Sequence, residues 1–265
     1  MPRMSLLALP NRELFGNLVR REVRGRYKGS WLGVVWTLIT PLVMMAAYTL
    51  VFTILWQVVD IPNYPVFLLT GLMFWTLLAG SLSVASTSLT GNADLLKKVA
   101  FPRQIVPLAA MVSQGLTTLV MLIILIPFGL WLMPGHRWTI LLVPVIALFS
   151  IALVAGVSLV VAVLNVFFRD TEHIITALLL PWFFLTPILY SFDSFPLATS
   201  HEWVVDVLKY GNFATPFVMA FQDVIFWGRV PSLDIFLYVV VVGTAALVGG
   251  WLIFRRMQRD LAVEL

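Results

Sequence analysis

Six long stretches of this 265-residue chain contain no Asp, Glu, Lys or Arg, and this spacing of charges restricts its fold more than any other feature. Each stretch reaches the roughly 20 residues that an α-helix needs to cross the hydrocarbon of a bilayer. Inside lipid every backbone N–H and C=O must be paired within the protein, so helices are the expected spanning elements. We therefore predict about six transmembrane helices, near residues 32–56, 65–88, 106–132, 139–166, 174–191 and 234–254.

The composition agrees with a membrane protein. Apolar residues make up 60% of the chain, charged residues 11%, and the mean hydropathy is +0.97. A soluble protein must keep its outside largely polar, and this chain has too little polar sequence for that. We expect an all-α integral membrane domain over residues 32–265 after a cytoplasmic tail and helix at 1–31. The basic start also contains Glu13 and Glu22 and no cleavage-like site, so we expect no signal peptide.

Lys and Arg residues predict the orientation. Of the 17, the predicted spans place 14 on the side that carries the N-terminus and three on the other side. Basic residues accumulate on the cytoplasmic side of membrane proteins, so both termini are expected to be cytoplasmic. The net charge of +4 comes from these flanks and not from one exposed basic stripe, so no nucleic-acid partner is expected.

Residues 12–28 are predicted to form an amphipathic helix before the first span. We expect its apolar face to lie among lipid headgroups and its cationic face to meet anionic lipid or a partner. Glu22 and Arg26 fall on the apolar side, four residues apart, and are expected to pair with each other. The apolar face comprises Leu14, Phe15, Leu18 and Val19. The basic residues assigned to this interface helix are Arg20, Arg21, Arg24, Arg26 and Lys28.

The segment between the fifth and sixth spans, residues 193–233, is long for a loop. Its charge-free run Gly211–Gln222 is too short to cross the bilayer, so we expect helices that re-enter the membrane from the outer side. Trp203 and Trp227 are expected to anchor this segment at the membrane interface. The fifth span is interrupted by Pro181 and Pro187.

The chain lacks recognisable catalytic machinery, and we expect no catalytic, metal or cofactor residue on it. Gly91–Lys98 has the lysines of a phosphate loop but not its second glycine. Cysteine is absent, and the three histidines are scattered. Arg169, Asp170 and Glu172 form an acid–base cluster at a cytoplasmic boundary, where we prefer a helix cap with local ion pairs over catalysis. The spans also lack the carboxylates of ion-coupled transporters, so coupling energy is expected from a partner.

Two adjoining motifs carry a family resemblance. Gly71–Trp75 and Asn92–Pro107 (NADLLKKVAFPRQIVP) resemble the second-span and coupling-loop signature of type-2 ATP-binding-cassette permeases. They are more closely similar to the branch that exports lipid-linked O-antigen, capsule, teichoic acid or galactan. Leu18–Gly33 resembles the interface helix of that branch running into its first span. Phe167–Asp170 and Asn212–Phe217 match later landmarks, although the family commonly has Asn-Pro where this chain has Asn212 and Phe213.

The resemblance implies a permease of the bacterial cytoplasmic (inner) membrane that exports a lipid-linked polysaccharide. Two copies would pair, and each would dock on a separate ATPase subunit that holds ATP and Mg, with no cofactor on this chain. Residues 92–103, within the loop 91–105, would form a short helix in a cleft of the ATPase, and 193–233 would form an outer gate. The coupling residues would be Asn92, Asp94, Leu95, Leu96, Lys97, Lys98, Phe101, Pro102 and Arg103.

Exposed apolar side chains at Leu95, Leu96 and Phe101 are expected to anchor that contact, with the lysines and Arg103 as a basic rim. The alternative is that these cations only follow the rule that cytoplasmic loops are basic.

The first span offers a candidate substrate path. Tyr48, Phe52 and Trp56 recur every four residues, and a polar row of Thr49, Thr53 and Gln57 runs beside them. Aromatic faces suit sugar C–H groups and the polar row suits hydroxyls. Equally, the aromatics are core or interface residues, and the threonines bond back to their own helix.

Other functions remain open at this point. A drug or lipid exporter of the same superfamily would use the same machinery. A membrane-embedded acyl- or glycosyltransferase would need an intramembrane His, Asp or Glu at a cleft, and a secondary transporter is disfavoured by the charge-free spans.

Overall fold

The computed structural model describes residues 9–57, 59–99, 101–132, 137–192, 202–258 and 261, so the start of the predicted N-terminal tail (1–8) and of the predicted gate region (193–201) lie outside the described residues. Within the described residues the chain is all-α, as predicted, and contains no strand. The α-helices are α1 Leu9–Tyr27, α2 Trp36–Thr49, α3 Tyr64–Ser88, α4 Ala93–Lys98, α5 Ile105–Leu132, α6 Val143–Phe167, α7 Thr171–Leu185, α9 Glu202–Asp206, α10 Thr215–Phe221 and α11 Leu233–Met257.

Five of the described helical stretches are long and apolar enough to cross a membrane: Trp36–Leu55, Tyr64–Ser88, Ile105–Trp131, Trp138–Phe167 and Leu233–Met257. They confirm five of the six predicted spans. The first of them is α2 continued by a π-helical turn at Leu50–Leu55.

The predicted fifth span was wrong at its end, because α7 stops at Leu185 and not near residue 191. The ring of Pro187 disfavours helical backbone at the residue before it, and Thr186 is extended with φ −96° and ψ 135°. With 15 residues, α7 is about 22 Å long, which is shorter than the hydrocarbon core of a bilayer.

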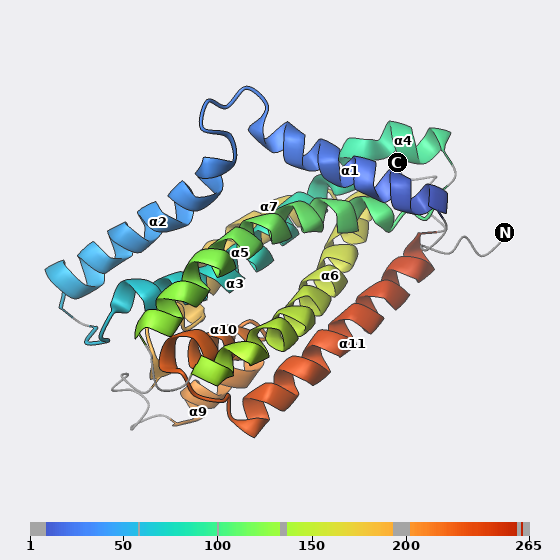
Figure 1. Cartoon of the computed structure of the whole chain (residues 1–265). Helices are drawn as coiled ribbons and strands as arrows, with labels where there is room; N and C mark the ends of the chain where they lie inside the picture. The colour runs from blue at the N-terminus through green and yellow to red at the C-terminus, as the bar shows by residue number, and fades with distance from the viewer. Residues whose placement is uncertain are drawn as a thin grey trace.

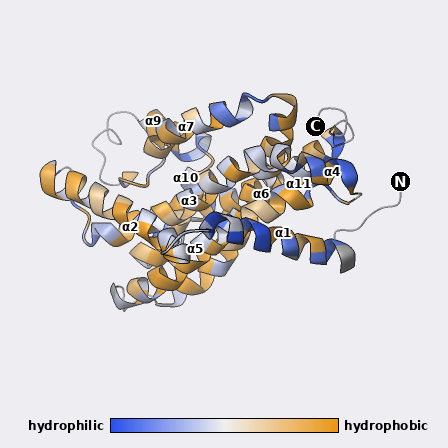
Figure 2. Cartoon of the chain, turned by 90° about the horizontal axis from the view of Figure 1, so that it is seen from above, coloured by the Kyte–Doolittle hydropathy of each residue, from blue (hydrophilic) through white to orange (hydrophobic). Residues whose placement is uncertain are grey.

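α3 is the central helix. In its span 72% of the residues are buried, against 6% in the span that contains α2. Figure 1 shows α1, α4 and the end of α11 at one end of the molecule, while α9 and α10 lie at the opposite end. Figure 2 shows hydrophilic residues gathered on α1 and α4, whereas the long helices are mostly hydrophobic.

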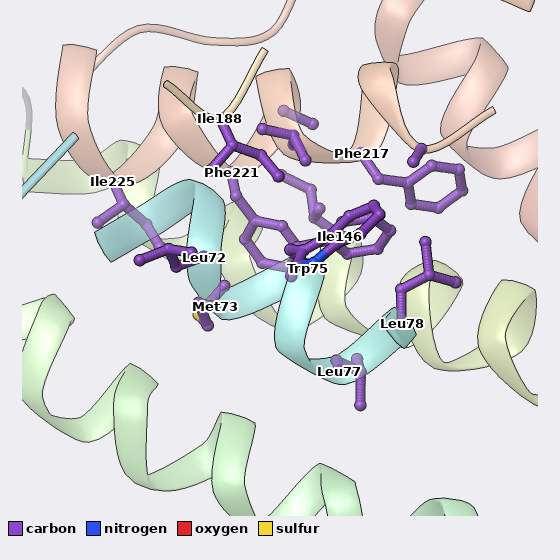
Figure 3. Packing of buried hydrophobic residues seen from close by; sticks show 14 of the residues in the cluster. Leu72, Met73, Trp75, Leu77, Leu78, Ile146, Ile188, Phe217, Phe221 and Ile225 are labelled. Carbon is purple, nitrogen blue, oxygen red and sulfur yellow. The ribbon is translucent and has the colours of Figure 1, made fainter. Parts of the chain in front are cut away.

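The region predicted to re-enter the membrane forms a short helix at the core. α10 continues through a π-helical turn, Gln222–Trp227, and ends where Gly228 adopts φ +63°. Phe217 and Phe221 of α10 are fully buried and point toward α3 (Figure 3). The ring of Phe217 stacks on Phe74 with 5.5 Å between centroids. This stretch of 215–227 is too short to cross a bilayer, as the charge-free run predicted.

α6 and α11 lie side by side with their backbones in contact (Figure 1). A Cβ atom on Gly156 of α6 would lie 2.0 Å from the carbonyl oxygen of Ala246, and one on Gly250 of α11 would lie 2.2 Å from that of Gly156. Gly243 similarly approaches the carbonyl oxygen of Phe149. Small residues permit such close approach between membrane helices, so these glycines fix how α6 and α11 pack.

Candidate functional site

The end of the molecule that carries α1 and α4 has its own hydrophobic core. This cluster joins several parts of the chain. It includes Leu18 of α1, Leu96 of α4, Phe101 in the following loop, Ile105 of α5, Val163 of α6 and Phe254 of α11. The interface helix and the coupling loop are therefore packed onto the ends of the long helices.

The prediction that Leu96 and Phe101 are exposed was wrong. Their side chains are only 6% and 9% exposed, and Leu95 is half-buried. α4 has six residues, and its Leu96 belongs to a buried cluster that also contains residues of α1, α5, α6 and α11. Its outer surface instead consists of Asp94, Lys97, Lys98 and Val99, of which Val99 is 48% exposed.

Hydrogen bonds hold the predicted coupling residues in place. The guanidinium of Arg21 donates to Oδ1 of Asn92, and Nδ2 of Asn92 donates to the carbonyl oxygen of Ser88 at 2.7 Å. Arg103 donates from Nη1 to the carbonyl oxygen of Gln258, also at 2.7 Å. The amide of Ile105 donates to the carbonyl of Pro102, which turns the chain into α5. The loop is thus bound to both the first helix and the end of the last one; Ala100 lies outside the described residues.

Two expectations for the interface helix were wrong. Its apolar face packs against α5, with Leu18 4% exposed and Leu14, Phe15 and Val19 partly buried, so this face meets protein and does not lie wholly among lipid headgroups. Glu22 and Arg26 do not pair. Glu22 accepts from Arg21 at 3.4 Å, and Arg26 reaches across to α5. The predicted cationic face is present, since Arg20, Arg21, Arg24 and Lys28 are exposed.

The boundary cluster Arg169, Asp170 and Glu172 is exposed at the turn between α6 and α7. Asp170 occupies the N-cap position of α7 but makes no side-chain cap, and within the described residues no ion pair joins these three. Asn165 at the end of α6 takes the capping role, because its Oδ1 accepts from the amide of Glu172 at 3.1 Å. The cap was predicted at the right turn and on the wrong residue.

The aromatic row of the first span is continuous with aromatic residues of α7 and α3. Tyr48 lies 6.3 Å from Phe52, and Phe52 lies 5.4 Å from Trp56, between ring centroids. Tyr48 also stacks on Phe183 at 5.6 Å, and Phe183 meets Trp75 edge-on at 5.5 Å. Such spacings are those of favourable aromatic pairs.

The polar row beside these aromatics behaves differently. The hydroxyl oxygens of Thr49 and Thr53 are buried without a hydrogen-bond partner, so they do not bond back to their own helix. Gln57 is exposed and has φ +51°, after the π-helical turn ends.

A cleft of about 640 Å³ lies between the end of α1, α2, α3, α5 and α7. Tyr48 and Phe183 from the aromatic row line it, and so does Arg26 from the interface helix. The cleft thereby joins two groups of residues that the sequence singled out separately.

Asn212 is a structural junction that the sequence marked only as a landmark. Its Oδ1 accepts from Nε1 of Trp182 at 2.7 Å and from the amide of Ala214 at 3.1 Å. Its Nδ2 donates to Oγ1 of Thr186 at 2.9 Å. One amide side chain therefore joins the end of α7 to the start of α10.

Ion pairs near the opposite end of the molecule were not predicted. Arg229 donates from Nε to the buried carboxylate of Asp223 at 2.6 Å. Of the two tryptophans of this region, Trp227 packs on Phe226, and Trp203 is exposed. Nζ of Lys209 lies 3.1 Å from Oδ2 of Asp234. Burial alone would lower the pKa of Lys209, but hydrogen bonds to Tyr210 and Asp234 outweigh burial and raise that pKa. Among the described residues no group of three His, Asp or Glu side chains is placed to hold a metal.

Comparison with known proteins matches residues 13–226 to the family described as "ABC-2 type transporter". An O-antigen export system permease protein RfbA of Myxococcus xanthus is 31% identical over 96% of this chain and 96% of its own length. Two proteins of the same name from Klebsiella pneumoniae are 34% identical over 71% of this chain and 72% of their length, and 29% identical over 92% of both.

Proposed function

The chain belongs to the ABC-2 type transporter family, and on that premise we propose that it is the permease subunit of an exporter that moves a lipid-linked polysaccharide across the bacterial inner membrane. The observation that carries the proposal is its similarity, over nearly the whole chain, to a permease named for O-antigen export. A drug or lipid exporter would share the family but not that similarity. Separate ATPase subunits would supply the energy.

We place α1, α4 and both termini in the cytoplasm. The excess of Lys and Arg on this side of the spans, 14 of 17, supports the placement. α1, α4 and the end of α11 also gather at one end of the molecule, as a common cytoplasmic side requires (Figure 1).

The outer surface of α4 is the proposed contact with the ATPase. Asp94, Lys97 and Lys98 provide charges, and Val99 provides exposed apolar area. Behind this surface, buried Leu96 and Phe101 join α4 to the ends of the long helices. A displacement of α4 would therefore be passed to α1 through Asn92 and to α11 through Arg103.

The aromatic row and the adjacent cleft are the proposed path for the glycan. Aromatic faces pack against sugar C–H groups, and Tyr48 presents one to the cleft. The hydroxyls of Thr49 and Thr53 are buried, and these threonines are not among the residues that line the cleft. A second copy of the chain would cover the apolar surface of the first span, where Val43 of α2 and Ile54 and Leu55 of the following π-helical turn are more than half exposed.

The test is reconstitution with the partner ATPase. Inverted vesicles that contain both subunits should move a lipid-linked glycan to their lumen when ATP is added, and a complex with an ATPase unable to hydrolyse ATP should not. The chain alone should hydrolyse no ATP. Turnover by the purified chain, or export of an unrelated drug in place of the glycan, would refute the assignment.

A further inference from the structure

The cleft beside the interface helix is lined by both polar and apolar side chains. Tyr27, Thr37, Thr76 and Gln114 contribute hydroxyl and amide groups. The lining from α2 and α7 is mostly apolar and includes Met44, Leu179 and Phe183, with Thr40 and Thr176 among it. Its volume of about 640 Å³ is that of a pocket for a ligand of drug size. A ligand that matched both parts would have a polar head and a hydrocarbon tail.

Arg26 supplies the one charge among the described residues that line the cleft. Its Nη1 donates to Oε1 of Gln114 and its Nη2 donates to Oγ of Ser113, both at 3.0 Å. These acceptors are neutral, and no ion pair within the described residues involves Arg26. The guanidinium is therefore fixed in direction while its positive charge is not neutralised.

A fixed guanidinium suits a phosphate. It has five N–H donors in a planar fork, of which the two bonds to α5 use two, and the fork matches phosphate oxygens. Arg24 and Lys28, two residues before and after Arg26, are exposed and add positive charge to this part of α1.

The apolar part of the cleft is open to a hydrocarbon chain. Half of the residues of α2 are exposed, and on α7 Leu180, which also lines the cleft, is 64% exposed. A lipid tail can therefore lie between α2 and α7 while the head remains at α1.

We propose that this cleft binds the phosphate head and the adjoining hydrocarbon of a lipid phosphate or diphosphate, with Arg26 holding the phosphate. The inference rests on the proposed function, because the lipid end of the glycan substrate is the amphiphile that this site would receive. The polar wall then faces the first sugar units, and the aromatic row continues from the same cleft.

The experiment measures equilibrium binding of radiolabelled farnesyl diphosphate to the permease–ATPase complex in phosphatidylcholine nanodiscs. Arg26→Gln should weaken binding about tenfold or more, the effect of losing charge-assisted hydrogen bonds. Arg26→Lys keeps the positive charge but not the planar set of donors, so its affinity for the probe should lie between those of the parent and Arg26→Gln. Arg12→Gln removes a positive charge from an exposed site on α1, about 21 Å along the helix from Arg26, and should bind the probe as tightly as the parent does.

A second variant keeps the bonds between Arg26 and α5. Thr176 is an exposed residue of α7 that lines the cleft, and Thr176→Asp places a carboxylate there without removing any contact of α1. Repulsion of the phosphate should weaken binding about tenfold. Parental binding by both Arg26→Gln and Thr176→Asp would overturn the proposal, whether or not Arg26→Gln disturbs the docking of α1.

Competitors identify the ligand chemistry. Farnesol and inorganic diphosphate should each compete weakly, because each lacks one half of the amphiphile. If farnesol competed as well as unlabelled farnesyl diphosphate, the phosphate would not be recognised. If inorganic diphosphate competed as well as unlabelled farnesyl diphosphate, the hydrocarbon tail would not be recognised. Displacement by phosphatidylglycerol at equal concentration would make this a general lipid site and refute its assignment to the substrate.

Glycan export measured on the same complexes separates the two proposals. A parent that exports the glycan but shows no binding that depends on Arg26 would refute the cleft alone. A parent that binds the probe through Arg26 but moves no glycan would refute the proposed function, and with it the link to the glycan.

Discussion

Gly250→Ala should loosen the contact between α6 and α11. The new Cβ would lie 2.2 Å from the carbonyl oxygen of Gly156, whereas Cβ contacts under 3.0 Å are essentially never seen. The helices must therefore separate by about 0.8 Å at this point. Overpacking of this kind is destabilising by about 1–3 kcal/mol, and the better helix propensity of Ala offsets up to about 1 kcal/mol. With the full offset the net loss is up to about 2 kcal/mol, which corresponds to a Tm lower by up to about 8 °C for a chain of this size.

Gly249 provides the matched control on the same helix. A Cβ there meets nothing within 4 Å, so Gly249→Ala should gain helix propensity with no clash. The measurement is the Tm of each detergent-solubilised variant, followed by far-ultraviolet circular dichroism. Equal Tm values for the two variants, or a Gly250→Ala protein more stable than the parent, would refute the argument that backbone contact fixes α6 against α11.

Three further predictions follow from the described contacts. Phe101→Ala removes a side chain that is only 9% exposed, so it should destabilise the permease by about 3 kcal/mol and lower its Tm. Lys98→Ala should leave the Tm unchanged. It should weaken co-purification of the ATPase, and more at low salt than at high salt. A cysteine at Ser232 should react with an impermeant thiol reagent on intact cells and one at Asn92 should not; the reverse labelling would invert the orientation. Asn212→Asp removes the N–H group that donates to Thr186 and places a charge beside Trp182. Trypsin should therefore cleave that variant between α7 and α10 faster than it cleaves the parent. An unchanged cleavage rate would show that Asn212 is not needed to hold α7 and α10 together.

The positions of charges predicted most of the helices, because a charge inside the hydrocarbon is so unfavourable that its absence marks a span. The end of α7 was missed for a different reason. Its sequence remains apolar past Leu185, and only the local backbone restriction before Pro187 ends the helix. Hydropathy carries no information about that restriction, although the proline itself was visible.

Exposure at the coupling loop was harder to predict. Six residues of α4 are too few to define an apolar face by periodicity, so nothing in the sequence indicated that Leu96 is buried in a cluster with residues of other helices. The pairing of Arg26 was missed because the sequence shows neighbours on one helix and not Ser113 and Gln114 of another. The spacing of Gly243 and Gly250, seven residues apart, was the available signal for the contact with α6.

The exposure of α2 bears on how proteins of this kind change over time. Only 6% of the residues in that span are buried within the chain, so most substitutions there remove few contacts that stabilise the fold. The span nevertheless carries Tyr48 and Phe52, and Trp56 follows it directly. Under the proposed glycan path, variation in this span can therefore alter what the molecule recognises while α3 and its neighbours continue to specify the fold. Selection for a new glycan can act on this helix with little penalty from protein stability.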